Sequence, residues 1–456
     1  MRIHLIAIGG SAMHNLALAL HSKGYKVSGS DDEIFEPSKS RLAAKGLLPE
    51  AIGWDENKIT PDIDAVILGM HARSDNPELL KAQALGLKIY SYPEYIYEQT
   101  KNKTRVVIGG SHGKTTITSM ILHVLKHCNI NCDYLVGAQL EGFDTMVKLS
   151  HEAKIAVIEG DEYLASPIDR RPKFHLYHPN IAVISGIAWD HINVFPTFEN
   201  YVEQFEKFIE LIEPNGTLTY CENDEVLVNT VKKSLNNSIQ KIAYGIPKHS
   251  IENGITYIYN SAQEKIPLKI FGNHNLMNLE AARNVCKALH ISENDFYNAI
   301  QSFKGAAKRL EFVAGNNHFA VYKDFAHSPS KLKATTQAVK QQFPNRKIVA
   351  CMELHTFSSL NENFLNEYNG SMNTADEAIV YYNPHTIAHK KLKPISEAQV
   401  KAAFNNQELK VFTDSKELIN YLKNKKWENS VLLLMSSGNF DGVDINKFGE
   451  ELVKNN

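Results

Sequence analysis

The sequence predicts an α/β protein with three domains built on parallel sheets. Three times, a short apolar segment runs into a small-residue or glycine-rich turn and then into a helix-like segment. Strands of a parallel sheet are buried on both faces, so they read as unbroken apolar runs between amphipathic helices. A length of 456 residues also suggests roughly three domains, at about 150 residues per domain.

The first domain, expected over residues 1–98, is Rossmann-like. Ile3–Ile8 predicts a strand, Gly9-Gly10-Ser11 a turn and Ala12–Ser22 a helix. Further strands are expected at 26–30, ending at the pair Asp31-Asp32, and at 64–69. The N-terminal apolar run is short and carries one charge, so it indicates a buried strand rather than a secretory signal.

The second and third domains are expected over residues 99–308 and 309–456. In the second, Arg105–Ile108 predicts a strand, and buried strands recur at 155–158 and 181–184, with a polar helix at 273–290. The third domain is again Rossmann-like, with strands expected at 318–324, 347–352, 378–382 and 430–435. Ligands of such sheets bind beyond the carboxyl ends of the strands.

Composition excludes several classes of protein. Forty-nine Lys and Arg against fifty-one Asp and Glu give a formal charge of −2, whereas nucleic acids and anionic membranes call for a basic surface. No apolar run approaches the roughly 18 residues that span a bilayer. The five cysteines are odd in number and form no C-x-x-C pair. We therefore expect a reduced, cytoplasmic protein without nucleic-acid partners or membrane insertion, and a monomer or weak homodimer.

The strongest motif is Gly110-Ser111-His112-Gly113-Lys114-Thr115-Thr116, between a strand and a helix. Glycines let backbone N–H groups surround phosphate oxygens, and the following helix directs its positive end at the same anion. Lys114 would neutralise the β- and γ-phosphates of a nucleotide, and the Thr115 hydroxyl suits Mg²⁺. The loop is a variant, because the usual spacing would place a glycine at Ile108.

Polar residues follow the next two predicted strands. Glu159-Gly160-Asp161-Glu162 ends the strand at 155–158, where hard oxygen ligands would meet a phosphate-bound Mg²⁺. The strand at 181–184 leads to Asp190-His191, and His191 would reach a second cation. An acidic strand end is equally compatible with a solvated cap, and a lone histidine is more often structural.

With these motifs in this order, the chain resembles the Mur ligases, three-domain ATP-dependent amide-bond ligases of peptidoglycan synthesis. The resemblance implies that Lys114 contacts the phosphates, that Thr115 and Glu159 hold one Mg²⁺, and that Glu159 and His191 serve a second. The segment 272–282 matches the family pattern G-x-H-N-x-x-N-x-x-A-A, so that Asn275 and Asn278 would read the adenine edge.

The third domain and the N-terminus carry further matches. The resemblance makes Arg309, at the junction between domains, a phosphate clamp. In the D-[YF]-A-H-x-P signature, Asp324 would orient the ribose and His327 would lie near the γ-phosphate. The N-terminal turn resembles the UDP-binding turn of the subgroup that adds the first stem-peptide unit. The implied UDP contacts are Gly9, Gly10, Ser11, Ala12, Met13, Ser30 and Asp31.

The chain also departs from the family pattern. Gly186 stands where the family has an asparagine, and His14 and Asn15 replace small residues beyond the UDP turn. The segment Cys351–Ser358 falls where the amino-substrate domain carries a more basic motif. This last departure bears on which amine is bound.

Two substrates compete within the family. Both types of ligase use UDP-N-acetylmuramate; one adds L-alanine, the other recycles L-alanyl-γ-D-glutamyl-meso-diaminopimelate. The run Asp169–Phe174, the acidic strand end and Glu353 favour the tripeptide, whereas His355 looks more like the alanine ligases. The tripeptide is therefore the expected amine, with L-alanine as the alternative. A non-ligating nucleotide-binding regulatory protein and a folate polyglutamate ligase are further alternatives, although the latter typically lacks the N-terminal unit.

The resemblance implies a two-step reaction that uses ATP and Mg²⁺. The carboxylate of UDP-N-acetylmuramate attacks the γ-phosphate to give an acyl phosphate and ADP, and the amine then displaces phosphate. Both steps concentrate negative charge, so the protein needs fixed positive groups rather than a nucleophile of its own. The residues expected at the reacting centre are Lys114, Glu159, His191, Arg309 and His327.

Overall fold

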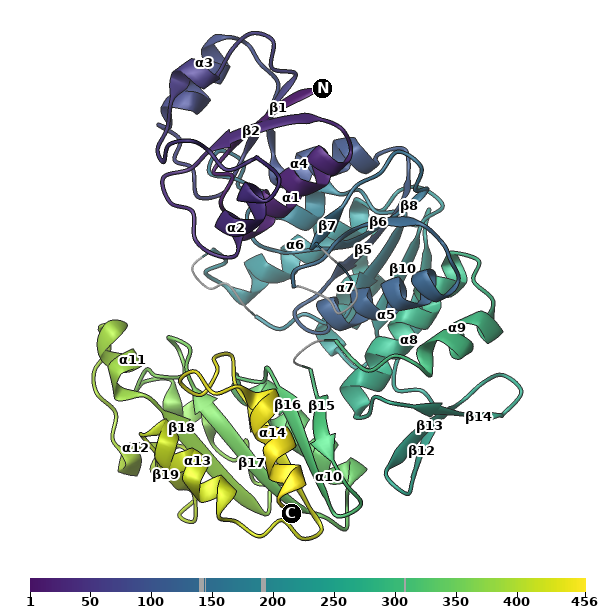
Figure 1. Cartoon of the computed structure of the whole chain (residues 1–456). Coiled ribbons are helices and arrows are strands. Elements are labelled where there is room, and N and C mark those ends of the chain that lie inside the picture. Colours follow the sequence, from purple (N-terminus) through teal and green to yellow (C-terminus); the bar gives the residue numbers. More distant parts are fainter. Residues whose placement is uncertain (139–142, 144, 190–193, 307–308) are drawn as a thin grey trace. The chain divides into compact units, whose positions relative to one another are not determined.

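The computed structural model describes residues 1–138, 143, 145–189, 194–306 and 309–456 (Figure 1). The chain divides into two compact units, and each is described by itself. The first unit comprises residues 1–246 and 277–300, and the second comprises residues 247–276 and 301–456. The sheets are dominated by parallel strand pairs with helices between them, which confirms the predicted fold class.

The first sheet of the first unit has four parallel strands, as expected of a Rossmann-like domain. They are β1 (Arg2–Ile6), β2 (Lys26–Ser30), β3 (Ala65–Leu68) and β4 (Ile89–Ser91), in the order β2-β1-β3-β4. The helices are α1 (Ser11–Ser22), α2 (Ser38–Ala43), α3 (Pro77–Ala84) and α4 (Tyr92–Thr100), with the short 3-10 helix η1 (Glu56–Lys58). Strand β1 ends two residues earlier than predicted, because Ala7 adopts a φ of +68° and begins the turn.

A seven-stranded sheet forms the rest of the first unit, in the order β11-β10-β9-β5-β8-β6-β7, parallel except for the pair β6–β7. Its strands are β5 (Thr104–Gly109), β6 (Cys132–Leu135), β7 (Val147–Lys148), β8 (Ile155–Glu159), β9 (Ile181–Ile184), β10 (Thr217–Cys221) and β11 (Gln240–Tyr244). Its helices are α5 (Lys114–His127), η2 (Lys173–Leu176), α6 (Phe198–Glu210), α7 (Glu225–Lys233) and α9 (Glu293–Ile300). Helix α8 (Asn273–Ala288) begins in the second unit and continues in the first.

A buried polar network connects helix α1 to the edge of this larger sheet. The Asn15 side chain is fully buried; its Oδ1 atom accepts the N–H of Met146 at 3.1 Å, and its amide nitrogen donates to the Ser11 carbonyl. The His14 ring bonds the Gly10 carbonyl through Nδ1, and burial lowers its pKa. The two residues that depart from the family pattern therefore tie the glycine turn to the chain just before β7.

The second unit contains a small antiparallel sheet that the sequence did not predict, and a larger sheet of which the sequence predicted four of the six strands. The small one consists of β12 (His249–Glu252), β13 (Ile255–Tyr259) and β14 (Lys265–Leu268). The larger one has the order β15-β16-β20-β17-β18-β19, formed by β15 (Glu311–Gly315), β16 (Phe319–Asp324), β17 (Lys347–Leu354), β18 (Glu377–Tyr382), β19 (Lys410–Phe412) and β20 (Ser430–Met435). Strand β15 pairs antiparallel with β16, and the other pairs are parallel.

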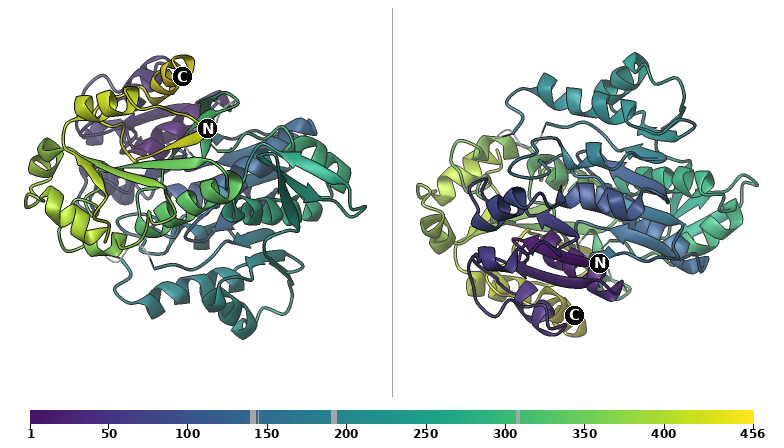
Figure 2. Two further views of the ribbon diagram at one scale, coloured as in Figure 1. Left: turned by 90° about the horizontal axis from the view of Figure 1, so that it is seen from below. Right: turned by 90° about the horizontal axis from the view of Figure 1, so that it is seen from above.

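Both faces of the six-stranded sheet are buried under helices (Figure 2). Its helices are α10 (Pro329–Gln342), η3 (Leu365–Tyr368), α11 (Pro384–His389), α12 (Glu397–Ala403), α13 (Ser415–Lys423) and α14 (Ile445–Lys454). Ile348 and Ala350 of β17 face the cluster that contains Leu332 of α10, whereas Val349 faces the cluster that contains Leu418 of α13. This alternation explains why the strands of this domain read as unbroken apolar runs.

Among the residues that the structure describes, no helix has both the length and the apolar character needed to cross a bilayer.

Candidate functional site

The glycine-rich loop lies between β5 and α5, as the sequence predicted. Gly110 and Gly113 adopt φ values of +113° and +80°, a region that L side chains rarely enter. Gly113 occupies the N-cap position and Lys114 is the first residue of the helix, so the N–H groups of the first turn end at the loop. This strand-turn-helix arrangement is the structural context that a phosphate-binding loop requires.

Thr115 and Glu159 meet because β5 and β8 are neighbouring parallel strands, with Ile108 paired to Glu159. The Thr115 hydroxyl donates to Glu159 Oε1 at 2.9 Å, and the N–H of Gly137 donates to Glu159 Oε2 at 2.9 Å. A Cβ at Gly137 would lie 2.9 Å from Glu159 Oε1. Gly137 therefore leaves room for the carboxylate beside the Thr115 hydroxyl, a pair of hard oxygen donors that suits Mg²⁺.

The chain after β9 supports the loop from the other side. The N–H of Ser111 donates to the Gly186 carbonyl at 3.0 Å, and the Ser185 hydroxyl donates to the carbonyls of His112 and Gly109. Gly186 adopts a φ of +148°, and a Cβ there would lie 3.1 Å from Asp224 Oδ2. This conformation gives the glycine at the family's asparagine position a structural reason.

Other residues expected around the loop are placed as follows. Thr116 is buried in the first turn of α5. Asn278 of α8 is buried beside Gly113, where a Cβ would collide with its side-chain oxygen, so the two predicted nucleotide contacts lie together. Asp190 and His191 fall outside the described residues. Within the described part of the chain, no group of three or more His, Cys, Asp or Glu side chains could hold a metal ion.

The remaining nucleotide residues belong to the second unit. The Arg309 guanidinium lies over the Phe325 ring, 5.0 Å from its centroid, and the ring of His327 bonds the Phe325 carbonyl at 2.8 Å. Asp324 is buried and accepts the N–H groups of Leu310 and Ala326, each at 2.6 Å. The structure thus brings Arg309, Asp324 and His327 together, and their roles toward a nucleotide stay predictions.

Two groups near this cluster have shifted pKa values. Burial raises the pKa of the Asp324 carboxyl despite its backbone hydrogen bonds and the nearby Arg309 charge. Burial also lowers the pKa of His274 to about 4, and the charge of Arg309 acts in the same direction. At neutral pH His274 is therefore uncharged. Asn275 donates from its amide to the Phe271 carbonyl at 3.0 Å, and its adenine contact is still a prediction.

The N-terminal turn is closed by the acidic residue that follows β2. Asp31 Oδ2 accepts the N–H of Gly9 at 2.6 Å, and a Cβ at Gly9 would lie 2.9 Å from the same oxygen. Burial raises the pKa of Asp31 to about 6, and the neighbouring Asp32 acts in the same direction. Helix α1 begins at Ser11, directly after Gly10, and Ala12 and Met13 lie in its first turn. Lys58 donates to the Ser30 hydroxyl at 3.0 Å.

The segment that departs from the family in the third domain ends β17. The Glu353 carboxylate is buried and accepts the Ser436 hydroxyl and the N–H of Phe440, the latter at 2.8 Å. His355 Nδ1 lies 3.6 Å from Glu353 Oε1, and the His355 side chain is 41% exposed. Because β17 and β20 are adjacent parallel strands, the segment after β17 that contains His355 and the turn after β20 that contains Ser436 lie at the same carboxyl end of the sheet.

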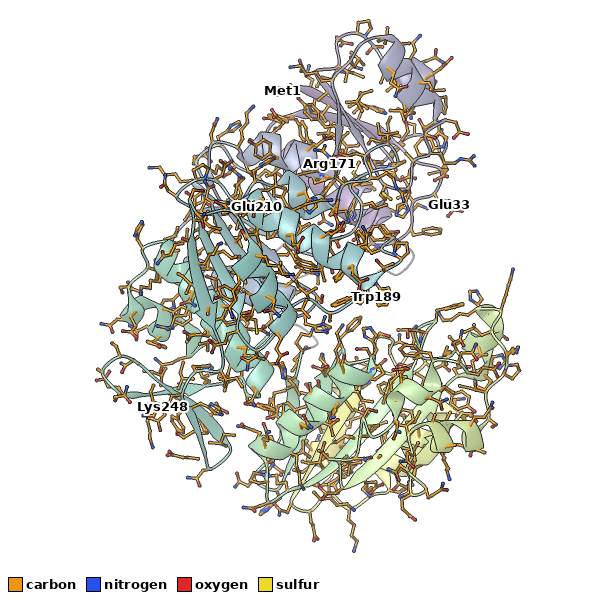
Figure 3. All side chains as sticks on the ribbon, turned by 180° about the vertical axis from the view of Figure 1, so that it is seen from behind. Met1, Glu33, Arg171, Trp189, Glu210 and Lys248 are labelled. Carbon is orange, nitrogen blue, oxygen red and sulfur yellow. The ribbon has the colours of Figure 1, made fainter. Side chains whose placement is uncertain are left out.

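Two residues around the loop, Tyr201 and Gly137, were not expected from the sequence. Glu162 was expected only as part of the acidic strand end that would meet Mg²⁺. In the structure it accepts hydrogen bonds from Lys114 and from Tyr201 of α6, and the N–H of Gly137 donates to Glu159. Glu162 is part of the acidic strand end, but no sequence signal connects Tyr201 to it across 39 positions. Trp189 (Figure 3), which lies in the chain between β9 and α6, donates from its indole nitrogen to the Phe195 carbonyl at 3.0 Å.

Comparison with known proteins adds a family assignment to this geometry. Three family models match the chain in order: "Mur ligase family, catalytic domain" over residues 2–104, "Mur ligase middle domain" over 108–286 and "Mur ligase, glutamate ligase domain" over 308–438. A UDP-N-acetylmuramate–L-alanine ligase of Clostridium kluyveri is 30% identical over 452 residues, covering 96% of this chain and 95% of that protein. The enzyme of the same name from Caldicellulosiruptor bescii is 33% identical over 387 residues, 82% of each chain.

Solved structures share the fold. UDP-N-acetylmuramate-alanine ligase MurC of Thermotoga maritima has a TM-score of 0.69 at 22% identity, and a murein peptide ligase of Psychrobacter arcticus has 0.62 at 21%; each comparison covers 100% of this chain and 98% of the other. The three domain matches and the relatives of near-equal length agree with the loop geometry. The chain belongs to the Mur ligase family of ATP-dependent enzymes, which form an amide bond and release ADP and phosphate.

Proposed function

We propose that this enzyme joins UDP-N-acetylmuramate to L-alanine. The observation that carries this proposal is the similarity, over nearly the whole length of both chains, to enzymes named for that reaction. This similarity favours L-alanine, the alternative drawn from the sequence, over the tripeptide, which was the expected amine. His355 also supports L-alanine as the amine. It is the residue that resembles the alanine ligases, and it is exposed at the carboxyl end of β17.

The residues that suggested the tripeptide have structural partners in the first unit. Phe174 is fully buried between aromatic rings, and Lys173 donates to Asp161 Oδ2 at 2.6 Å. Arg171 (Figure 3) pairs with Asp169 at 2.7 Å and with Glu94 at 3.2 Å. These contacts account for the run Asp169–Phe174 without an amine substrate, so the run is weak support for the tripeptide.

The tripeptide stays as a second candidate because of Glu353. Its buried carboxylate, of the recycling type, is hydrogen-bonded within the turn that follows β20 and lies beside His355. The edge of the third-domain sheet therefore combines one residue typical of each ligase type.

Both steps of the proposed reaction concentrate negative charge on phosphate oxygens, so the site needs fixed positive groups. A lactyl carboxylate oxygen attacks the γ-phosphorus, the bond to the β–γ bridging oxygen breaks, and ADP leaves. The amine nitrogen then attacks the acyl carbon, loses a proton and expels phosphate. In this proposal Lys114 neutralises the transferring phosphoryl group, and the N–H groups at the start of α5 bind its oxygens. Arg309 and His327 of the second unit keep the roles toward phosphate that the family resemblance implies.

The proposed metal site follows from the donor set. Thr115 and Glu159 supply adjacent oxygens at the carboxyl ends of β5 and β8, which fit a hard cation. When bound, Mg²⁺ would offset charge on the phosphate oxygens. His191, the further ligand expected from the sequence, lies outside the described residues.

Replacing Glu159 with alanine should raise the Mg²⁺ concentration needed for half-maximal activity by roughly 10–100-fold, the range seen when groups that orient a metal are removed. The reason is the loss of the carboxylate that lies 2.9 Å from the Thr115 hydroxyl. Titration of ADP release against Mg²⁺ measures the effect, with Glu203→Ala on the exposed face of α6 as the matched control. An unchanged Mg²⁺ titration would remove Glu159 from the metal site.

The amine is identified by product mass. The enzyme is incubated with ATP, Mg²⁺ and UDP-N-acetylmuramate, and L-alanine and the tripeptide are offered in separate reactions. We expect ADP release only when both the sugar nucleotide and an amine are present, with the product mass increased by one alanyl residue. A product that carries the tripeptide would establish the second candidate, and ADP release independent of both substrates would contradict ligation.

A further inference from the structure

The ammonium group of Lys114 already has two partners in the loop. It donates to the Gly110 carbonyl at 2.8 Å and to Glu162 Oε2 at 2.8 Å. The Lys114 side chain is 17% exposed, and that of Glu162 is 2% exposed. A lysine ammonium has three N–H donors, so two defined partners fix its direction and leave one donor for a phosphate oxygen.

Glu162 is itself held by a second network. Its other carboxylate oxygen accepts the hydroxyl of Tyr201 at 3.1 Å, and the Tyr201 side chain is fully buried in α6. The same hydroxyl lies 3.1 Å from the Ser111 hydroxyl, which donates to the Ala188 carbonyl and accepts the N–H of Ala188. Tyr201 of α6 thus anchors the Glu162 carboxylate and also contacts Ser111, the second residue of the loop motif.

A buried carboxylate in this position works against nucleotide affinity. Burying a charge is costly unless it is paired, and a negative group beside a phosphate-binding lysine weakens the attraction for phosphate. Its benefit is geometric, because a free lysine side chain has rotamer entropy that must otherwise be lost when the phosphate binds. A charge-assisted hydrogen bond holds the ammonium more strongly than a neutral one.

We propose that Glu162, supported by Tyr201, is a positioning residue that holds the Lys114 ammonium in the direction required for phosphoryl transfer, at some cost in ATP affinity. The proposal rests on the proposed function of the loop as the ATP site. It concerns orientation in the transition state, so it predicts an effect on kcat rather than on KM for ATP.

The test is Glu162→Gln, which keeps the shape and an acceptor oxygen but removes the charge. We expect kcat to fall about tenfold, within the range that small misplacements of catalytic groups produce, while the Kd for ATP stays equal or becomes tighter. Glu162→Asp, which keeps the charge, should recover part of kcat. Glu203→Gln, on the exposed face of the same helix as Tyr201, is the matched control and should behave as wild type.

Tyr201→Phe provides a second variant in case Glu162→Gln does not fold. It removes only the hydroxyl that anchors the carboxylate, and it should lower kcat in the same direction by a smaller factor. A kcat within twofold of wild type in both variants, or a loss confined to the Kd for ATP, would overturn the proposal. If the wild type itself forms no product, the ligase proposal fails instead, and ATP binding by calorimetry still tests whether removing the charge weakens affinity.

Discussion

Replacing Lys114 with alanine is expected to lower kcat by roughly 10²–10³, the loss produced by removing one electrostatic donor from a developing charge. Lys114 is the first residue of α5, and its ammonium is held over the loop by Gly110 and Glu162. Without it, the phosphoryl group loses the fixed positive charge that the chain supplies in the first unit. Steady-state ADP release with saturating substrates measures the change.

The control for this variant is Lys126→Ala. Lys126 lies in the last turn of the same helix and is exposed, so the substitution removes the same charge from α5 at the end remote from the loop. It should leave kcat within about twofold of wild type, because screened surface charges contribute little. A Lys114→Ala enzyme that releases ADP at the wild-type rate would contradict the assignment of the loop.

Gly110→Ala should abolish nucleotide binding and destabilise the protein. A Cβ at this position would overlap the Ser185 hydroxyl and lie 2.6 Å from the Ser185 backbone nitrogen, and the residue has a φ of +113°. Left-handed backbone costs a non-glycine residue about 1–2 kcal/mol, and overpacking adds about 1–3 kcal/mol. Because the obstructing atoms include backbone, the loop and not a side chain must move. Urea unfolding and calorimetry with ADP measure the two effects.

Gly24→Ala separates strain from obstruction. Gly24 has a φ of +89°, yet a Cβ there would meet nothing within 4 Å. We expect the free energy of unfolding of Gly24→Ala to fall by about 1–2 kcal/mol, because of backbone strain alone, and its affinity for ADP to equal that of the wild type. Equal ADP affinity in wild type and Gly110→Ala would show that the close approach of the loop to Ser185 is not needed for binding.

The parts of the fold that could be predicted are those in which local signals agree. The loop between β5 and α5 was predicted because an apolar run, glycines and a helix-forming segment follow one another, and the helix begins at Lys114 as expected. The antiparallel strands β12–β14 were missed because they are short and partly exposed, with exposed residues such as Ile251 and Ile255 that give no clear alternation. Strand β15, an exposed edge strand, gave no clear signal for the same reason.

The site was predictable where strand ends meet and not where distant segments do. The sequence placed Thr115 and Glu159 beyond the carboxyl ends of two strands, and the family resemblance assigned them to one Mg²⁺; the parallel pairing of β5 with β8 brings the two side chains together. Tyr201 reaches Glu162 from a helix that begins 14 residues after β9 ends, through packing that no local pattern encodes. Gly186, noted only as a departure, has its reason in its own φ of +148° and in the nearby Asp224 carboxylate.

The hydrogen bond between Asn15 and Met146 has a practical consequence for dissecting the enzyme. A fragment truncated after the first sheet would leave the Asn15 oxygen, fully buried in the intact chain, without its backbone donor, and would uncover the side of α1 that rests against β7. Such a fragment should aggregate or bind uridine nucleotides poorly even if its own four strands form. Isolated-domain experiments should therefore retain the chain through at least β7.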